Sequence, residues 1–265
     1  MHPVPRVRHV ARRWANACIA GVLFMMVVAC GNSSTSPPQS PQIIVAAASD
    51  LRPAFEELAW QFSQDTGINV TFSFGSSGQI REQIINGAPF DVFASANAQF
   101  VDEVIDADRA LEETKTNYAV GRIVLWSASP DTLPTDISRL KDTTYIRIAI
   151  ANPTHAPYGL AAEQALKTSG VFNTIENRLV YGENISDTKQ IIDSGNATVG
   201  IIALSLAIAD GREYVLIPDT LHTPLLQAVV VTATGDQVPL AQQWVDYMSS
   251  PRGIEVMAEY GFVRP

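Results

Sequence analysis

Short apolar runs alternate with amphipathic helical segments along most of the chain. The run IIVAAAS at residues 43–49 has the length and composition of a buried strand, and it is followed by apolar residues at helical spacing, including Leu51, Phe55 and Leu58. Similar pairs of segments recur toward the C-terminus. This alternation is typical of βαβ units built around parallel sheets, so the sequence predicts an α/β fold.

Two long β-rich segments divide this pattern into two lobes. NYAVGRIVLWS at 117–127 has the character of a crossing from one sheet to another, and LQAVVVT at 226–232 that of a return crossing. We expect residues 43–117 and 226–265 to form lobe 1, and residues 118–225 to form an inserted lobe 2. Each lobe is expected to hold a mixed, mainly parallel sheet flanked by helices. Two lobes joined by two crossings form a hinged clamp.

The first 29 residues have the composition of an export signal. Four Arg and no acidic residue precede an apolar run that ends at Cys30, about half as long as a membrane-spanning helix. Val27-Val28-Ala29-Cys30 is similar to the bacterial lipobox, in which the Cys is acylated and becomes the new N-terminus. Residues 30–42, rich in Ser and Pro, predict a flexible tether. We expect a lipid-anchored protein in the periplasm or on the outer face of the cell membrane. The alternative is an ordinary signal peptide with an incidental Cys.

The chain is acidic, with 18 Lys and Arg against 27 Asp and Glu. Loss of residues 1–29 would leave 14 basic against 27 acidic residues. No basic stripe remains that could release counterions from phosphates, which argues against nucleic acid as a partner. The mature chain would keep only Cys30, which excludes an intrachain disulfide and a cysteine-based zinc site. We expect a monomer.

Four segments share one pattern, in which a strand ends, small or hydroxyl residues follow, and a helix begins. They are ASD at 48–50, GSSG at 75–78, HAPYG at 155–159 and ENIS at 183–186. In open α/β sheets ligands lie beyond the carboxyl ends of strands, and helix N-termini offer unpaired N–H groups with a partial positive charge. The four junctions therefore predict a site for a small anion. The alternative for each junction is that its Ser or Asn only caps its own helix.

An ordered set of segments contains these junctions: AAASDL (46–51), FGSSGQI (74–80), INGAPFDVFASA (85–96), GRIVLWSA (121–128), NPTHAPYGLAAEQAL (152–166), YGENIS (181–186) and VGIIALS (199–205). Together they resemble the periplasmic molybdate-binding proteins of ABC importers, over nearly all of the chain from Ile43 to Phe262. The resemblance implies a type II periplasmic-binding fold with two α/β lobes, two crossovers and no cofactor. It also implies molybdate or tungstate as the ligand and a membrane permease as the partner.

The family's motifs further imply which residues bind the oxyanion. Ser49 and Ser77 would each donate a hydroxyl and a backbone N–H from lobe 1. Tyr158 and Ile185 would each donate a backbone N–H from lobe 2. These four residues would hold the metal only as its oxyanion, through oxygen. Some family members add a Tyr hydroxyl at the position of Ala203, so that donor is absent here.

Asp50 is the acidic residue of this predicted site. A carboxylate beside a dianion is repulsive, by about 1 kcal/mol at 4 Å in water and more when desolvated. We therefore expect Asp50 to cap the following helix and point outward, with its N–H left for the ligand. A carboxylate that pointed inward could accept a proton from hydrogen phosphate. A binding protein for another anion, such as phosphate, sulfate or a small organic acid, is accordingly the alternative function.

A serine hydrolase is a further alternative. The sequence Gly75-Ser76-Ser77-Gly78 lacks the G-x-S-x-G spacing of a nucleophile elbow. His155 is the only candidate base near a turn, and we expect it to be a structural turn residue. The sequence contains neither a P-loop motif nor HExxH. Binding is therefore favoured over catalysis.

Overall fold

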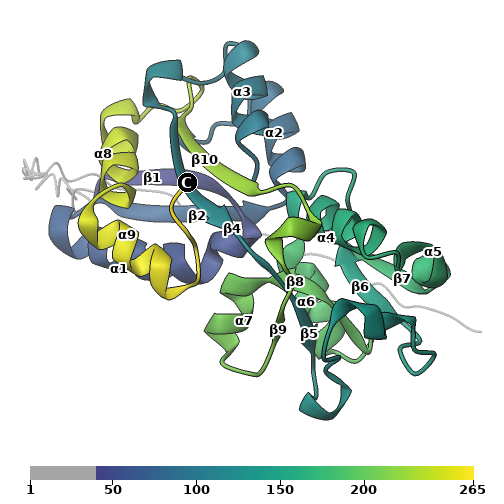
Figure 1. The fold of residues 1–265 in the computed structure, drawn as a ribbon. Helices are drawn as coiled ribbons and strands as arrows, with labels where there is room; N and C mark the ends of the chain where they lie inside the picture. Colours follow the sequence, from purple (N-terminus) through teal and green to yellow (C-terminus); the bar gives the residue numbers. More distant parts are fainter. Residues whose placement is uncertain (1–39) are drawn as a thin grey trace, which may run out of the picture. The chain divides into compact units, whose positions relative to one another are not determined.

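Two five-stranded sheets, each flanked by helices, organise the part of the chain that the computed structural model describes, residues 40–265 (Figure 1). The predicted export signal, Cys30 and most of the tether lie outside the described residues. The strands of the first sheet are β1 (Gln42–Ala48), β2 (Asn69–Gly75), β3 (Val92–Ser95), β4 (Thr116–Gly121) and β10 (Leu225–Val231). Those of the second are β5 (Ile123–Ser127), β6 (Ile148–Ala151), β7 (Leu179–Gly182), β8 (Val199–Ala203) and β9 (Val215–Leu216).

The two sheets share one arrangement of strand directions. Their orders are β2-β1-β3-β10-β4 and β7-β6-β8-β5-β9. In the first, β1 is parallel to β2 and β3, while β10 is antiparallel to β3 and β4. In the second, β6 is parallel to β7 and β8, while β5 is antiparallel to β8 and β9. The predicted α/β class with mixed, mainly parallel sheets is confirmed.

Helices cover both sheets. Those of lobe 1 are α1 (Arg52–Thr66), α2 (Ser77–Ile85), α3 (Ala98–Asp106), α8 (Val238–Met248) and α9 (Pro251–Glu259). Those of lobe 2 are α4 (Pro157–Thr168), α5 (Phe172–Ile175), α6 (Ile185–Asp193) and α7 (Leu204–Asp210). Among the helices of residues 40–265, none combines the length and the apolar character needed to span a membrane.

The chain passes from the first sheet to the second at Arg122. β4 pairs with β10, with a register shift between Gln227 and Ala228, and β5, which starts at Ile123, pairs with β8. The crossing therefore falls a few residues after the boundary expected at 117–118. Residues 117–127 form one apolar stretch in the sequence, and only strand pairing divides this stretch between the two sheets.

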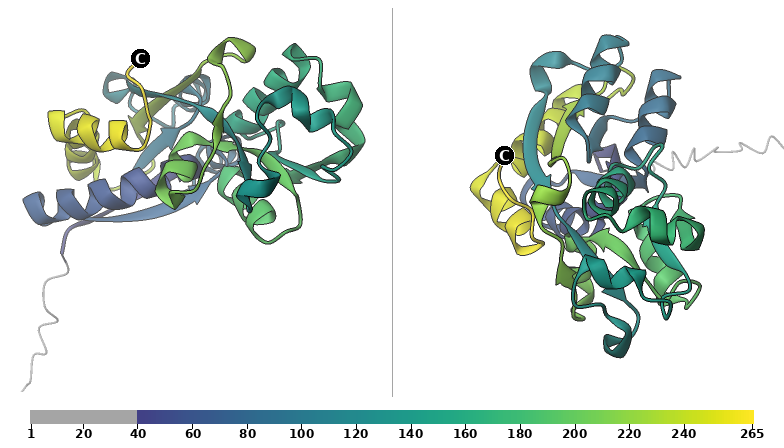
Figure 2. Two further views of the ribbon diagram at one scale, coloured as in Figure 1. Left: turned by 60° about the horizontal axis from the view of Figure 1, so that its bottom comes forward. Right: turned by 45° about the vertical axis from the view of Figure 1, so that its right-hand side comes forward.

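Lobe 1 has apolar residues on both faces of its sheet. On one face, Phe55 and Phe62 of α1 pack edge-on against Trp244 of α8, with ring centroids 5.5 and 5.4 Å apart. On the other face, Ile84 of α2 and Val101 of α3 belong to a second buried cluster. The C-terminal helices α8 and α9 lie beside α1, so both ends of the described chain contribute to one lobe (Figure 2).

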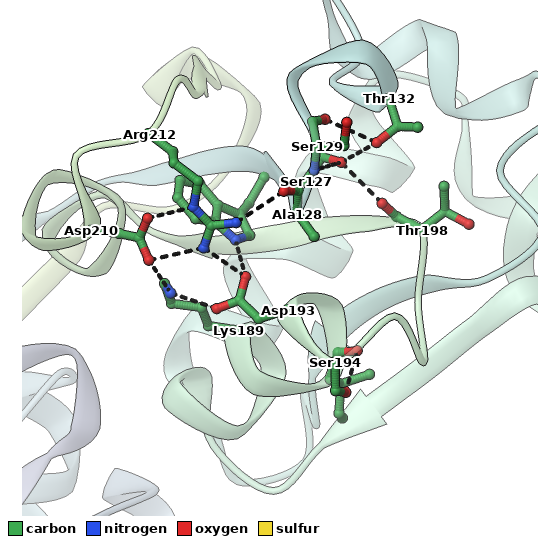
Figure 3. A network of polar contacts seen from close by, with 12 residues as sticks. Ser127, Ala128, Ser129, Thr132, Lys189, Asp193, Ser194, Thr198, Asp210 and Arg212 are labelled. Atoms are coloured by element: carbon green, nitrogen blue, oxygen red, sulfur yellow. Dashed lines mark hydrogen bonds and ion pairs between the residues drawn. The ribbon is translucent and has the colours of Figure 1, made fainter.

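A network of charged residues fixes α6 within lobe 2 (Figure 3). Trp126 Nε1 donates to Asp193 Oδ1 at 3.1 Å, and the cations of Lys189 and Arg212 lie 5.1 and 4.5 Å from the Trp126 ring. Lys189 also joins Asp193 to Asp210, at 2.6 Å from each. Hydrogen bonds from Arg212 and Lys189 hold the pKa of Asp210 well below its usual range. The network ties the C-terminal part of α6 to β5 and α7.

Candidate anion-binding site

All four predicted junctions meet at one small cavity between the lobes. Its volume is about 10 Å³, and its lining includes Ser49, Asp50, Ser76, Ser77, Pro157, Tyr158, Asn184 and Ile185. Lobe 1 contributes the ends of β1 and β2, and lobe 2 contributes the starts of α4 and α6. The convergence that sequence spacing could not establish is therefore present in the structure.

Ser77 is positioned to donate its hydroxyl proton into the cavity. It is the first residue of α2 and is 1% exposed. Its Oγ accepts a hydrogen bond of 3.0 Å from Ala96 N. A hydroxyl that accepts in this way still has its single proton to give. Its backbone N–H belongs to the first turn of α2, where N–H groups have no partner within the helix.

Ser49 follows β1, and its hydroxyl is engaged across the lobe boundary. Ser49 Oγ donates to Asn184 Oδ1 at 3.0 Å and accepts a hydrogen bond from Ser186 N at 3.3 Å. Ser186 Oγ in turn donates to Ser49 O at 3.0 Å. The Ser49 hydroxyl must therefore turn away from Asn184 before it can donate to an anion.

Lobe 2 presents two helix starts to the cavity. At α6, Asn184 is the N-cap, and its Oδ1 accepts from Ser186 N and Asp187 N at 3.0 Å each. The Ile185 N–H, which precedes these capped groups, remains for a ligand. At α4 the first residue, Pro157, has no N–H, so Tyr158 supplies the first N–H of that helix.

The Asp50 side chain is buried at the lobe junction, so the expectation that it caps a helix and points outward is wrong. It is 0% exposed, and neither the short 3₁₀ turn Ser49–Leu51 nor α1 has a side-chain cap. Asp50 Oδ2 accepts a hydrogen bond of 2.8 Å from Gln227 Nε2 in β10, and Oδ1 has no partner among the described residues. Burial raises the pKa of Asp50 to about 6, although the hydrogen bond from Gln227 lowers it. Asp50 turns inward because its partner, Gln227, is fully buried beside it.

Further hydrogen bonds join the lobes around the cavity. Ser76 Oγ donates to His155 O at 2.6 Å, and Gly78 N donates to the same oxygen at 2.9 Å. Ser205 Oγ donates to Asp50 O at 2.7 Å. His155, expected to be a structural turn residue, thus lies on the lobe boundary.

Sequence reasoning placed Ser76 and Asn184 in the junctions only as possible helix caps, and it did not name Ser205 or Gln227. Gln227 carried a visible signal, since it is a polar residue within the otherwise apolar run LLQAVVV. For Asn184 the alternative of a helix cap is confirmed, because its side chain accepts two hydrogen bonds from the start of α6. Ser76 and Ser205 carried none, because their partners lie far away along the chain.

Most polar groups at the cavity are neutral donors, and the Asp50 carboxyl is the acidic group of its described lining. Of the described residues that line it, none is Lys or Arg. Within residues 40–265, no three His, Cys, Asp or Glu side chains gather as they would to hold a metal ion. A metal in this cavity would be held only through oxygens of its own.

Comparison with known proteins agrees with this architecture. The family model described as "Bacterial extracellular solute-binding protein" matches residues 43–263. The molybdate-binding protein ModA of Rhodobacter capsulatus is 36% identical, over 86% of this chain and 90% of its own length. The ModA of Azotobacter vinelandii is 35% identical, over 91% and 97%. The solved structure of an Azotobacter vinelandii periplasmic molybdate-binding protein superposes with a TM-score of 0.80 at 31% identity, covering 84% of this chain and 99% of that one. This match confirms the type II periplasmic-binding fold, and the chain belongs to the family of bacterial extracellular solute-binding proteins.

Proposed function

We propose that this protein captures molybdate, and tungstate with it, outside the cytoplasm and delivers the anion to the membrane permease of an ABC importer. The observation that carries the proposal is the meeting of four donor segments from two lobes at one cavity without a basic side chain. The molybdate-binding relatives at 35–36% identity support it.

In the proposed complex, Ser49 and Ser77 donate hydroxyl and N–H groups from lobe 1. The N–H groups of Tyr158 and Ile185 donate from lobe 2, and the N–H of Asp50 adds to the set. Helix starts carry a partial positive charge that favours an anion without a formal positive charge nearby. A site in which donors outnumber its one carboxylate, Asp50, favours a fully deprotonated dianion, because a protonated oxygen that faces a donor has no acceptor.

Phosphate is the second candidate, and one observation favours it. Within residues 40–265, Asp50 Oδ1 is buried without a hydrogen-bond partner, so it is an acceptor that hydrogen phosphate could use. Against phosphate, Oδ2 of the same carboxylate accepts a hydrogen bond from Gln227, and this bond holds the Asp50 side chain toward the lobe junction. Sulfate shares the charge of molybdate and would be separated from it by size.

The proposal extends to location and assembly. The family consists of extracellular solute-binding proteins, which supports a site of action outside the cytoplasm. The lipobox at Cys30 supports a lipid anchor that holds the clamp at the outer face of the cell membrane. We propose a monomer that binds its ligand without transforming it.

Isothermal titration calorimetry with molybdate, tungstate, sulfate and phosphate tests this proposal. Molybdate and tungstate are expected to bind, and sulfate more weakly by about 10-fold or more, the scale on which a pocket separates ligands that differ by size alone. Phosphate binding as tight as molybdate binding would contradict the choice of ligand and assign Asp50 the role of acceptor.

A further inference from the structure

Gly78, in the first turn of α2, lies against the backbone of His155 in lobe 2. Gly78 N donates a hydrogen bond of 2.9 Å to His155 O. A Cβ atom on Gly78 would lie 2.6 Å from that oxygen and 3.0 Å from His155 Cα. The three atoms nearest to this Cβ all belong to His155. His155 of lobe 2 therefore leaves no room for a side chain at position 78. The helix α2 by itself would accept an alanine there.

Ser76 makes a second bond to the same residue. It occupies the N-cap position of α2, where a serine usually accepts a hydrogen bond from its own helix, but it makes no such bond. Its hydroxyl donates instead to His155 O at 2.6 Å, and it lies 2.9 Å from His155 Nδ1. The Ser76 side chain is 2% exposed, so this polar contact is shielded from water. The capping role typical of this position has been replaced by a contact between lobes.

We propose that Ser76, Gly78 and His155 form a closure contact that sets how long the anion stays bound. Ser76 and Gly78 flank Ser77, and His155 lies just before Tyr158, so the contact joins the two segments that present these donors. An anion enclosed between the lobes leaves when the lobes separate, and separation breaks both bonds to His155 O. The three residues are positioning residues, and the inference rests on the proposed function for the identity of the anion.

The substitution Gly78→Ala tests the contact because it opposes closure while leaving lobe 1 intact. Stopped-flow release of molybdate, with tungstate as competitor, is expected to be about 10-fold faster, as when a closed state loses on the order of one good hydrogen bond. The association rate should change little, since interface substitutions act mainly on dissociation. The unfolding temperature of the ligand-free variant should equal or exceed that of the wild type, because alanine is a better helix former than glycine.

Two serine variants separate closure from helix capping. Ser76→Ala should release molybdate about 3- to 10-fold faster with little change in unfolding temperature, because Ser76 does not cap α2. Ser250, the N-cap of α9, does accept a hydrogen bond from its own helix, at 3.2 Å from Gly253 N. Ser250→Ala should therefore lower the unfolding temperature and leave the release rate unchanged. Release at the wild-type rate from both Gly78→Ala and Ser76→Ala would overturn the closure contact.

The identity of the ligand and the closure contact are tested by different measurements. A wild-type protein that binds no molybdate contradicts the proposed function, and the closure contact is then judged by small-angle scattering of the ligand-free proteins. A larger radius of gyration for Gly78→Ala than for the wild type supports the contact. Equal radii overturn it.

Discussion

Gln227 Nε2 donates a hydrogen bond of 2.8 Å to Asp50 Oδ2, and the same amide nitrogen donates to Tyr158 Oη at 3.1 Å. Tyr118 Oη donates to the amide oxygen of Gln227, Oε1, at 2.8 Å. Asp50 and Tyr158 also line the anion cavity, one from each lobe. Gln227 lies on β10, the strand by which the chain returns to lobe 1. β10 is therefore bonded directly to one site residue from each lobe, and β4 is bonded to Gln227 of β10 through Tyr118.

The buried carboxyl of Asp50 should make the stability of the protein depend on pH. Its pKa of about 6 lies above the ordinary value of 3.8, so the folded state binds this proton more tightly than the unfolded state does. The resulting stabilisation is complete below about pH 4 and is lost as pH rises through 6. A shift of this size corresponds to about 3 kcal/mol. Urea unfolding from pH 4 to pH 8 should show this decline in the wild type.

In the variant Asp50→Asn, the free energy of unfolding should not show this part of the decline with pH, because an amide does not titrate in this range. Asp131→Asn, which changes an exposed residue in lobe 2, is the control and should follow the wild-type curve. Parallel curves for Asp50→Asn and the wild type would show that Asp50 does not carry a raised pKa in the folded protein.

The sequence was sufficient to predict the features that depend on local pattern. Ser49 and Ser77 could be placed at strand ends because a strand followed by a helix is recognisable within about ten residues. Asp50 was placed wrongly because its partner Gln227 is 177 positions away, and a nearby helix was the only partner visible in the sequence. Ser76 was passed over for the same reason, since its partner is 79 positions away. Contacts between lobes have no local signature, so sequence reasoning misses them.

The hydroxyls of Ser77 and Ser49 should contribute different amounts to the free energy of molybdate binding. The Ser77 proton has no competing acceptor among the hydrogen bonds of the described residues, so Ser77→Ala should weaken molybdate binding by about 1.5–3 kcal/mol, or about 10- to 150-fold in Kd. The Ser49 hydroxyl must first leave Asn184, so Ser49→Ala should cost less. Calorimetry on both variants, with Ser194→Ala at an exposed position as control, measures the difference. A larger loss for Ser49→Ala would reverse this assignment.

Asn184 and Asn97 cap α6 and α3 in the same way, but only Asn184 faces the cavity. Asn97 Oδ1 accepts from Gln99 N at 2.9 Å, as Asn184 Oδ1 does from its own helix. Each replacement by Ala should lower the free energy of unfolding by about 1 kcal/mol. Asn184→Ala should also weaken molybdate binding, because the start of α6 is no longer held in place beside Ile185. Equal affinities for the two variants in calorimetry would show that the cap of α6 has no role in binding.

The predicted lipid anchor can be tested apart from the binding site. If Cys30 is acylated, Cys30→Ser should release the protein from the membrane fraction or block its processing. Fractionation followed by immunoblotting measures this, with Ser77→Ala as a control that should remain on the membrane. Unchanged membrane association of Cys30→Ser would leave an ordinary signal peptide or another attachment as the explanation.

Gly121 ends β4 at the crossing, beneath the Tyr158 side chain. A Cβ atom at Gly121 would overlap the Tyr158 hydroxyl and come within 2.9 Å of Gln227 Nε2. Gly121→Ala should therefore destabilise the folded protein by about 1–3 kcal/mol, the usual cost of overfilling a packed interior.

Tyr158→Phe removes the overlapping oxygen and keeps the backbone N–H of residue 158. The double variant should recover part of the lost stability, and it should bind molybdate more tightly than Gly121→Ala alone. Urea unfolding and calorimetry on the two single variants and the double variant give the coupling between the residues. Strictly additive effects would mean that the alanine is accommodated by a movement of β4 that leaves Tyr158 in place.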